Sequence, residues 1–262
     1  MTPSCIVITG ASSGLGAGLA VAYAEPGRRL GLTGRNADRL AAVAAACRSK
    51  GATVEAVAMD VADADAMTAW LQGFDAAGSV DLLIANAGIS AGTRPDGGPE
   101  GMATARQVIQ TNLLGIMNTV EPLLPRMTAR GWGQIAVVAS VAAYRGLPDS
   151  PSYCASKAGV MAYGEALRAG LEPMGIRVSV VVPGFFVSPM SVRHMGHQMF
   201  VVSEACAVAR VVRGLSRRAR RIVFPRRLAW LLQAGALLPA WLGDPIIRAF
   251  RFHVVPPPSR GG

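Results

Sequence analysis

Cysteine is scarce in this chain of 262 residues, and the four cysteines lie far apart. They are Cys5, Cys47, Cys154 and Cys206. No two of them form a C-x-x-C pair, so we find no redox or metal-binding cysteine motif and expect reduced thiols. His194 and His197 have the spacing of metal ligands. No carboxylate or cysteine stands beside them, however, and we expect no metal site.

Segments that could cross a membrane or stack on bases are also missing. The apolar stretch 228–242 has about 15 residues and contains Gly235 and Pro239, whereas a helix that spans a bilayer needs roughly 20. No secretory signal precedes the first apolar run, so we expect a cytoplasmic protein. Aromatic residues make up only 6% of the chain, and we expect no nucleic-acid partner because single-strand binding depends on aromatic stacking.

Lysine is nearly absent, since the chain has 24 arginines and only two lysines, Lys50 and Lys157. Lys157 follows Tyr153 by four positions, and Ser140 precedes that tyrosine by thirteen. A four-residue step on a helix puts both side chains on one face. The spacing therefore predicts that a compact ammonium, which is easier to tune than a guanidinium, lies beside the phenol.

A cation in that position would make the phenol a usable acid and base. An unperturbed tyrosine has a pKa of about 10, and lowering it to about 7 takes on the order of 4 kcal/mol of preferential stabilisation of the phenolate. We expect Lys157 to supply that stabilisation. The alternative is a packed ring beside a solvated lysine. Cys154 points about 100° away from Tyr153 on the helix, and we assign it no chemistry.

A glycine-rich segment follows the first apolar run, residues 5–8. Residues 9–16 read Thr-Gly-Ala-Ser-Ser-Gly-Leu-Gly, with glycines in the pattern G-x-x-x-G-x-G, and an alanine-rich stretch comes next. This order predicts a strand, a loop and a helix. Glycines let the backbone approach a pyrophosphate, and free amides at a helix N-terminus meet its charge. The segment therefore predicts a phosphate-binding loop.

Further apolar runs recur along the chain, separated by segments with helical spacing. They cover residues 29–33, 54–58, 82–85, 134–139 and 176–182. Alternating strands and helices predict an α/β fold, a doubly wound and mostly parallel sheet with helices on both faces. The carboxyl ends of such strands share one edge, which is where the sequence motifs fall. The length suits one well-buried core, and residues 92–101 are expected to form a surface loop.

Several separated motifs together resemble the single-domain short-chain dehydrogenases/reductases, over about residues 3–225. The motifs are residues 9–16, Asp60-Val61, Asn86-Ala87-Gly88, Asn112, Ser140, Tyr153 with Lys157, and Pro183-Gly184. The resemblance implies a Rossmann fold, a nicotinamide cofactor and oxidoreduction between C=O and CH–OH groups. We also expect a homo-oligomer.

The resemblance also implies roles for single residues. A catalytic tetrad would consist of Asn112, Ser140, Tyr153 and Lys157. Ser140 would donate a hydrogen bond to the substrate oxygen, Tyr153 would deliver the proton, and Asn112 would hold a water that links the lysine to solvent. The cofactor would be bound by Gly10, Ser12, Ser13, Gly14, Leu15, Gly16, Arg35, Asp60, Val61, Asn86, Ala87, Gly88, Tyr153, Lys157, Pro183, Gly184 and Ser188.

The end of the second predicted strand bears on the choice of cofactor. Residues 32–36 read Leu-Thr-Gly-Arg-Asn, and no acid occurs before Asp38. A site specific for NAD normally places a carboxylate there. Arg35 could instead pair with the 2′-phosphate of NADP, so we expect NADP(H) to be preferred over NAD(H). The alternative is an arginine that is solvated at a helix start, and Ser13 lacks the basic side chain that would give a second contact.

Residues expected to face the substrate are mostly apolar. They are Ile89, Ala142, Tyr144, Leu147, Phe185, Phe186 and Met190, with Met195, Met199 and Phe200 on the following loop. Apolar walls with flexible methionines favour a lipophilic ketone, alcohol or acyl group over a sugar. Alternatively, several of these residues only pack a lid.

The net charge of +10 resides in the last quarter of the chain. Residues 1–192 contain 14 basic and 14 acidic residues, whereas residues 193–262 contain 12 arginines against Glu204 and Asp244. Six of the arginines, at positions 217, 218, 220, 221, 226 and 227, precede the apolar stretch with Trp230 and Trp241. This pattern is typical of a surface that binds an anionic membrane. Packing on the core, a subunit contact and an acidic acyl carrier protein are the alternatives.

We therefore expect one Rossmann-type catalytic domain over residues 1–225. Residues 226–262 are expected to form a basic and apolar extension that packs on the same domain and ends in a disordered tail. The favoured function is NADP(H)-dependent interconversion of a hydrophobic ketone or acyl carbonyl and its alcohol, with a 3-oxoacyl carrier-protein reductase as an enzymatic variant. A non-catalytic dinucleotide-binding or peripheral membrane scaffold is the other interpretation, but a scaffold needs no proton donor.

Overall fold

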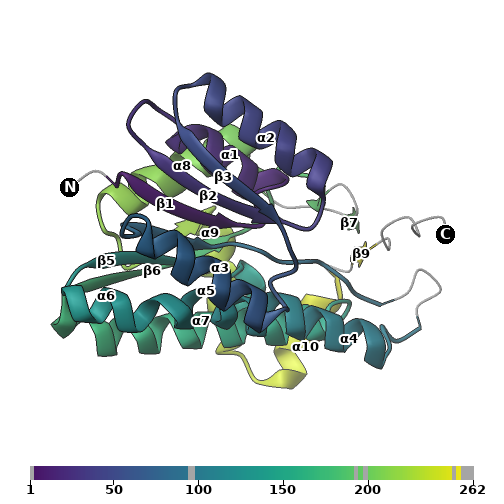
Figure 1. Cartoon of the computed structure of the whole chain (residues 1–262). Coiled ribbons are helices and arrows are strands. Elements are labelled where there is room, and N and C mark those ends of the chain that lie inside the picture. The colour runs from purple at the N-terminus through teal and green to yellow at the C-terminus, as the bar shows by residue number, and fades with distance from the viewer. Residues whose placement is uncertain (1–2, 94–97, 192–193, 197–199, 250–251, 255–262) are drawn as a thin grey trace.

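A seven-stranded sheet forms the centre of the computed structural model, which describes residues 3–93, 98–191, 194–196, 200–249 and 252–254. The strands have the order β3-β2-β1-β4-β5-β6-β8, and every pairing in this sheet is parallel. They are β1 (Cys5–Thr9), β2 (Arg29–Gly34), β3 (Thr53–Ala58), β4 (Leu82–Ala85), β5 (Gly133–Val138), β6 (Ile176–Pro183) and β8 (Arg221–Phe224). The predicted doubly wound parallel sheet is confirmed (Figure 1).

Helices cover both faces of this sheet (Figure 1). They are α1 (Gly14–Tyr23), α2 (Ala37–Ser49), α3 (Ala64–Ala76), α4 (Met102–Ile109), α5 (Gly115–Val120), α6 (Leu124–Arg130), α7 (Pro151–Leu171), α8 (Glu204–Ser216), α9 (Arg226–Ala236) and α10 (Ala240–Ala249). Two short strands, β7 (His194–Gly196) and β9 (Phe252–Val254), pair antiparallel outside the main sheet.

The hydrophobic core has two layers, because successive side chains of a strand point to opposite faces. In β1, Cys5 and Val7 belong to the layer under α3, α5, α7 and α9. Ile6 and Ile8 belong to the layer under α1, α2 and α8. All four are buried, which explains why this strand is a continuous apolar run without alternating polar positions.

The strands that the apolar runs predict all form, with bounds that differ by at most about two residues. The sequence did not predict β8, a four-residue strand that lies between arginines at its amino end and Pro225 at its carboxyl end. It also did not predict that the stretch 228–242 divides into α9 and α10. The break falls at residues 237–239, directly before α10, where Pro239 provides no backbone N–H.

Three described helices, α2, α3 and α8, have a side-chain cap at their start, whereas α1 does not. Asn36 caps α2 by accepting from the Arg39 amide at 2.8 Å, and Asp63 caps α3 by accepting from the Ala66 amide at 3.0 Å. At the start of α1, Ser13 makes no such hydrogen bond and no acidic residue lies in the first turn. The first amides of α1 are therefore left for another partner.

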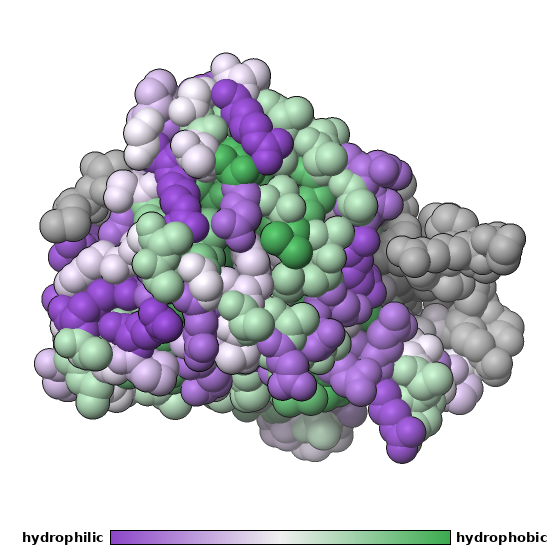
Figure 2. All heavy atoms as spheres, in the orientation of Figure 1, coloured by the Kyte–Doolittle hydropathy of each residue, from purple (hydrophilic) through white to green (hydrophobic). Residues whose placement is uncertain are grey.

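The outer surface is mixed in polarity. On the face seen in Figure 2, hydrophilic residues are interspersed with hydrophobic ones over the outward sides of the helices. Within the described ranges, no helix has both the length and the apolar character that crossing a membrane requires.

Candidate active site

A cavity of about 1170 Å³ lies along the carboxyl edge of the sheet. Sixteen of the seventeen residues predicted to bind a cofactor line it. They are Gly10, Ser12, Ser13, Gly14, Leu15, Arg35, Asp60, Val61, Asn86, Ala87, Gly88, Tyr153, Lys157, Pro183, Gly184 and Ser188. The remaining one, Gly16, is buried in the first turn of α1 directly behind the loop. Residues that are spread over positions 10–188 of the sequence thus line the same cavity.

The loop after β1 has the geometry of a phosphate-binding turn. Gly10 and Gly14 have φ angles of +67° and +53°, which L-residues with a Cβ rarely adopt. A Cβ on Gly16 would lie 2.2 Å from the Gly10 carbonyl oxygen, so only glycine fits. The uncapped amides of α1 face the cavity beside Ser12 and Ser13. This arrangement fits the pyrophosphate of a dinucleotide.

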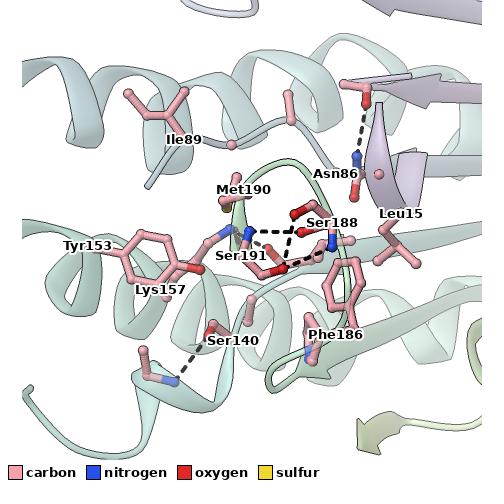
Figure 3. A pocket seen from close by; sticks show the side chains of 18 of the residues that line it. Leu15, Asn86, Ile89, Ser140, Tyr153, Lys157, Phe186, Ser188, Met190 and Ser191 are labelled. Atoms are coloured by element: carbon pink, nitrogen blue, oxygen red, sulfur yellow. Dashed lines mark hydrogen bonds between the residues drawn. The ribbon is translucent and has the colours of Figure 1, made fainter. Parts of the chain in front are cut away.

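Asn86 ties the loop after β4 to the loop after β1. Its Nδ2 donates to the Thr9 carbonyl oxygen at 3.0 Å, and the Thr9 hydroxyl accepts from the amides of Asn86 and Ala87 at 3.1 and 3.2 Å. Figure 3 shows Asn86 at one end of the pocket, close to Leu15. These bonds hold the ends of the neighbouring strands β1 and β4 together.

The end of β2 presents basic side chains to the cavity. Arg35, Asn36 and Arg39 line it, whereas Asp38 does not. Arg35 also lies 3.8 Å from a carboxylate oxygen of Asp60, and both side chains are almost half exposed. An exposed pair at that separation contributes less than about 1 kcal/mol, so Arg35 is not firmly held. Arg39 was not predicted, although its place in the first turn of α2 is visible in the sequence.

Ser140, Tyr153 and Lys157 point into the same part of the cavity (Figure 3). Ser140 lies two residues after the end of β5, and Tyr153 lies in the first turn of α7. The Ser140 hydroxyl lies close enough to the Tyr153 phenol to lower the phenol's pKa. The Lys157 ammonium lies 5.9 Å from the centroid of the Tyr153 ring and donates to the Val138 carbonyl oxygen at 2.8 Å. The predicted spacing thus does bring these three side chains together.

The pKa values at this site differ from the prediction. Burial raises the pKa of Tyr153, and the Ser140 hydroxyl opposes that rise only in part. Burial also lowers the pKa of Lys157 to about 8. The expected lowering of the tyrosine pKa by Lys157 is therefore wrong, because the lysine is itself penalised by burial and directs its ammonium at the Val138 carbonyl. Tyr153 is consequently protonated at neutral pH.

Asn112 lies behind the cavity and does not line it. It is fully buried in a π-helical turn, Gln110–Leu114, of the kind that often marks functional positions. Its side chain accepts from the Ile89 amide at 2.7 Å and donates to the Ile89 carbonyl oxygen at 2.9 Å. It also donates to the Ser156 hydroxyl at 3.1 Å, and Ser156 donates to the Tyr153 carbonyl oxygen at 2.7 Å. Asn112 therefore positions α7 and the loop after β4, and its predicted water stays a prediction.

Gly88 keeps space between Asn112 and Lys157. A Cβ at this position would lie 3.3 Å from Asn112 Oδ1 and 3.4 Å from Lys157 Nζ. The first distance is tighter than most Cβ contacts, and the second is at the limit of ordinary van der Waals contact. The small residue therefore lets the loop after β4 approach the buried ammonium.

The other end of the cavity is apolar, and most residues expected to face the substrate line it. They are Ile89, Ala142, Leu147, Phe185, Phe186 and Met190. Phe200 does not line it and is 41% exposed. The side chains of Met195 and Met199, together with those of His194 and His197, lie outside the described residues.

The prediction for Tyr144 is wrong. Its ring packs against the core layer of β5 and α7, and the residue lines a smaller pocket that adjoins the cavity at Ala142, Leu147 and Ile247. Tyr144 follows the 3₁₀ turn Val141–Ala143. With three residues per turn, it lies about 240° around from Ala142 and so points away from the cavity.

The C-terminal helices supply apolar lining that sequence reasoning missed. These residues are Leu228, Leu231, Leu232, Leu238 and Ile247. Leu228, Leu231, Leu232 and Gly235 follow the spacing i, i+3, i+4 and i+7, which predicts one face of a helix. That periodicity could have indicated the lining face of α9 from the sequence. Leu228 and Ala229 are also buried in the core, so α9 packs on the sheet. The division at residue 225 stays a prediction.

No group of three or more His, Cys, Asp or Glu side chains gathers as a metal site in the part of the chain that the structure describes.

We predict that Lys157→Met stabilises the fold at neutral pH. The folded pKa of about 8 lies below the ordinary value of 10.5, so between these pH values the unfolded chain binds more protons and stability rises with pH. Below about pH 8 the penalty is fully present. We expect the substitution to raise the free energy of unfolding at pH 7 by about 2 kcal/mol, with a smaller gain near pH 10.

Denaturant unfolding at both pH values measures this difference. Lys50→Met is the matched control, because Lys50 is the other lysine and is exposed. A Lys157→Met protein that is destabilised equally at both pH values would contradict the burial penalty.

The known proteins that this chain is similar to are dehydrogenases and reductases, which agrees with the geometry of the site. The family model described as short chain dehydrogenase matches residues 4–198. An uncharacterized oxidoreductase of Myxococcus xanthus is 36% identical over 94% of this chain and 96% of its own length. The ketoacyl reductase HetN of a Nostoc strain is 35% identical over 71% of this chain and 64% of its own.

Among solved structures, a short-chain dehydrogenase from Sphingobium yanoikuyae in complex with NADPH superposes with a TM-score of 0.75 at 26% identity. The match covers 94% of this chain and 92% of that one. The chain therefore belongs to the short-chain dehydrogenases/reductases, and it is a nicotinamide-dependent oxidoreductase that acts on CH–OH and C=O groups.

Proposed function

We propose that the protein interconverts a hydrophobic ketone or acyl carbonyl and its alcohol, with NADP(H) as the preferred cofactor. The observation that supports this most is the position of the Ser140 and Tyr153 hydroxyls. They lie where the glycine-rich, basic end of the cavity meets its apolar end. A dinucleotide in the first part and a lipophilic chain in the second would bring a carbonyl carbon to these two hydroxyls.

The cofactor, when bound, supplies or accepts the hydride. Tyr153 is protonated at neutral pH, which is the form that donates a proton to a carbonyl oxygen. Ser140 lies beside Tyr153 and would donate a hydrogen bond to the developing oxyanion. The phenolate that forms would lie beside the Lys157 ammonium, so the lysine acts after proton transfer begins. In the oxidative direction these roles reverse.

The walls of the substrate end support a lipophilic substrate. Leu147, Phe185, Met190 and Ile247 come from three segments, the loop before α7, the loop after β6 and helix α10, and contribute no charge. A sugar would leave its hydroxyls without partners at such walls, at a cost of about 1–3 kcal/mol for each buried unpaired group. A ketone or acyl chain needs polar partners only at its carbonyl oxygen.

The cofactor preference is supported by Arg35 and Arg39. Both line the cavity at the end of β2, where Asp38 does not reach it. Two guanidinium groups provide the charge-assisted, bidentate contacts that a 2′-phosphate accepts. Arg39 could thus give the second basic contact that Ser13 cannot. NADPH is bound by the Sphingobium yanoikuyae relative.

A 3-oxoacyl carrier-protein reductase is the second candidate, and the likeness to the ketoacyl reductase HetN favours it. The exposed arginines Arg226 and Arg227 at the start of α9 could meet an acidic carrier. A non-catalytic scaffold is disfavoured, because Ser140, Tyr153 and Lys157 are assembled as a proton-transfer site. A homo-oligomer, a cytoplasmic location and contact with an anionic membrane remain parts of the proposal.

A panel of carbonyl compounds tests the proposed function. We expect oxidation of NADPH, followed by its absorbance, with ketones and 3-oxoacyl thioesters that carry apolar chains, and much slower oxidation of NADH. The matched controls are hydrophilic ketoses with the same carbonyl group. Turnover confined to the ketoses would contradict the substrate class, and turnover of none of the compounds would contradict the proposal as a whole.

We predict that Arg35→Ser weakens NADPH binding by about 10- to 100-fold, because a hydrogen-bonded charge pair contributes about 1.5–3 kcal/mol. NADH has no 2′-phosphate, so its dissociation constant should change by less than about twofold. Fluorescence titration measures both constants. Arg168→Ser on α7 is the control, since Arg168 does not line the cavity. An equal loss for both cofactors would show that Arg35 does not discriminate between them.

A further inference from the structure

The α9–α10 hairpin exposes an unusual concentration of large apolar side chains. We define the hairpin surface as Trp230, Leu231, Leu237, Leu238, Trp241 and Leu242. Leu237 is 88% exposed, Trp230 77% and Trp241 75%. Single exposed apolar residues are ordinary, but six on two consecutive short helices and the turn between them indicate a surface that an apolar partner covers.

The hairpin surface is continuous with the catalytic cavity. Leu231 and Leu238 line the cavity and are also 54% and 37% exposed, so they form part of its mouth. Leu228, Leu232 and Ile247 continue the apolar lining inward from the same two helices. A lipophilic molecule could therefore pass from the hairpin surface to Ser140 and Tyr153 without leaving apolar surroundings.

The charge around the hairpin surface is positive. Arg226 and Arg227 precede Trp230 and Leu231 by three to five positions, so they lie within about one turn of the helix. Arg248 lies near the end of α10. All three are exposed, and no described carboxylate forms an ion pair with them. The acidic residue of these helices, Asp244, is already paired with Arg145 at 2.8 Å.

The other arginines of the predicted cluster lie elsewhere. Arg220 pairs with Glu172, and Arg221 pairs with Glu165. Both lie at the amino end of β8, whereas α9 begins beyond its carboxyl end. The cluster that looks continuous in the sequence is thus divided by a strand, and only its last two members adjoin the hairpin.

We propose that the hairpin surface inserts into an anionic lipid surface and that the cavity takes its substrate from that lipid through the mouth at Leu231 and Leu238. This inference rests on the proposed function, whose substrate class it narrows to carbonyl or alcohol compounds that reside in a bilayer. Tryptophans favour the interface between lipid headgroups and acyl chains, and nearby arginines are attracted to anionic headgroups.

A second copy of this chain fits the hairpin surface less well. A symmetric contact places the same patch of both copies face to face. Arg226, Arg227 and Arg248 of one copy would then approach the same arginines of the other, with the acidic residue of each hairpin already occupied by Arg145. An anionic surface supplies the opposite charge instead.

Vesicle flotation tests the lipid contact, with the Trp230→Ser/Trp241→Ser double variant against the wild type. Both tryptophans are exposed, so their removal should leave the fold intact. We expect the wild type to float with vesicles of equal parts phosphatidylcholine and phosphatidylglycerol at low salt, and less with phosphatidylcholine alone. The double variant should lose at least about tenfold in partitioning.

Trp132→Ser is the matched control, because Trp132 lies directly before β5 and is 39% exposed. This is the amino edge of the sheet, whereas the cavity lies along the carboxyl edge. It should float like the wild type. Equal flotation of the double variant and the wild type would overturn the proposal. So would a smaller assembly of the double variant by light scattering, because the hairpin would then be a subunit contact.

Two ketones separate this inference from the proposed function. With a short, water-soluble ketone, the double variant should match the wild type in kcat/KM. With a long-chain ketone dissolved in the same anionic vesicles, its kcat/KM should fall at least about tenfold. Equal activity of both proteins on the vesicle-bound ketone would overturn the route through the hairpin. If the wild type turned over neither ketone, the proposed function would fail, while flotation would still decide the lipid contact.

Discussion

A buried ammonium at the edge of the sheet is the constraint around which this site is built. Lys157 is 4% exposed and donates to the carbonyl oxygen that closes β5. Removing a cation from water is costly, and such a position is kept only where neighbouring groups compensate. The Val138 carbonyl oxygen at the end of β5 accepts a hydrogen bond from this ammonium and offsets part of the cost. Lys157 is one of only two lysines in a chain with 24 arginines. An arginine guanidinium is bulkier and planar, and it is hydrated differently from the lysine ammonium.

The consequence of this burial is a phenol that rests in its protonated form. Burial raises the pKa of Tyr153 and lowers that of Lys157, because in each case it stabilises the neutral form relative to the charged form. The site therefore holds a proton ready for donation, and the lysine becomes important as negative charge grows on the oxygen. Asn112 contributes through geometry, since its amide links the loop at Ile89 to Ser156 on α7.

The sequence predicted the sheet and the proximity of Ser140, Tyr153 and Lys157 well, because both depend on local spacing. Apolar runs such as residues 82–85 mark buried parallel strands, and the four-residue step from Tyr153 to Lys157 fixes a helix face. The pKa values could not be predicted in this way, since burial depends on segments far apart in the chain. The direction of the Tyr144 side chain could not be predicted because it depends on a single 3₁₀ turn. The lining of the cavity by α9 and α10 depends on how these last helices fold back over it. The cluster of arginines was misleading because β8 separates its members in space.

We propose Tyr153 as the group that gives up the proton, and its hydroxyl is the atom to remove. A Tyr153→Phe protein keeps the ring and loses only the acid, so turnover of the best ketone by stopped-flow absorbance should fall by about 10²- to 10⁴-fold. The dissociation constant for NADPH, measured on the same preparation, should stay within about twofold, because the phosphate-binding loop and Arg35 are untouched. Retention of most of the turnover would contradict the assignment of the proton donor.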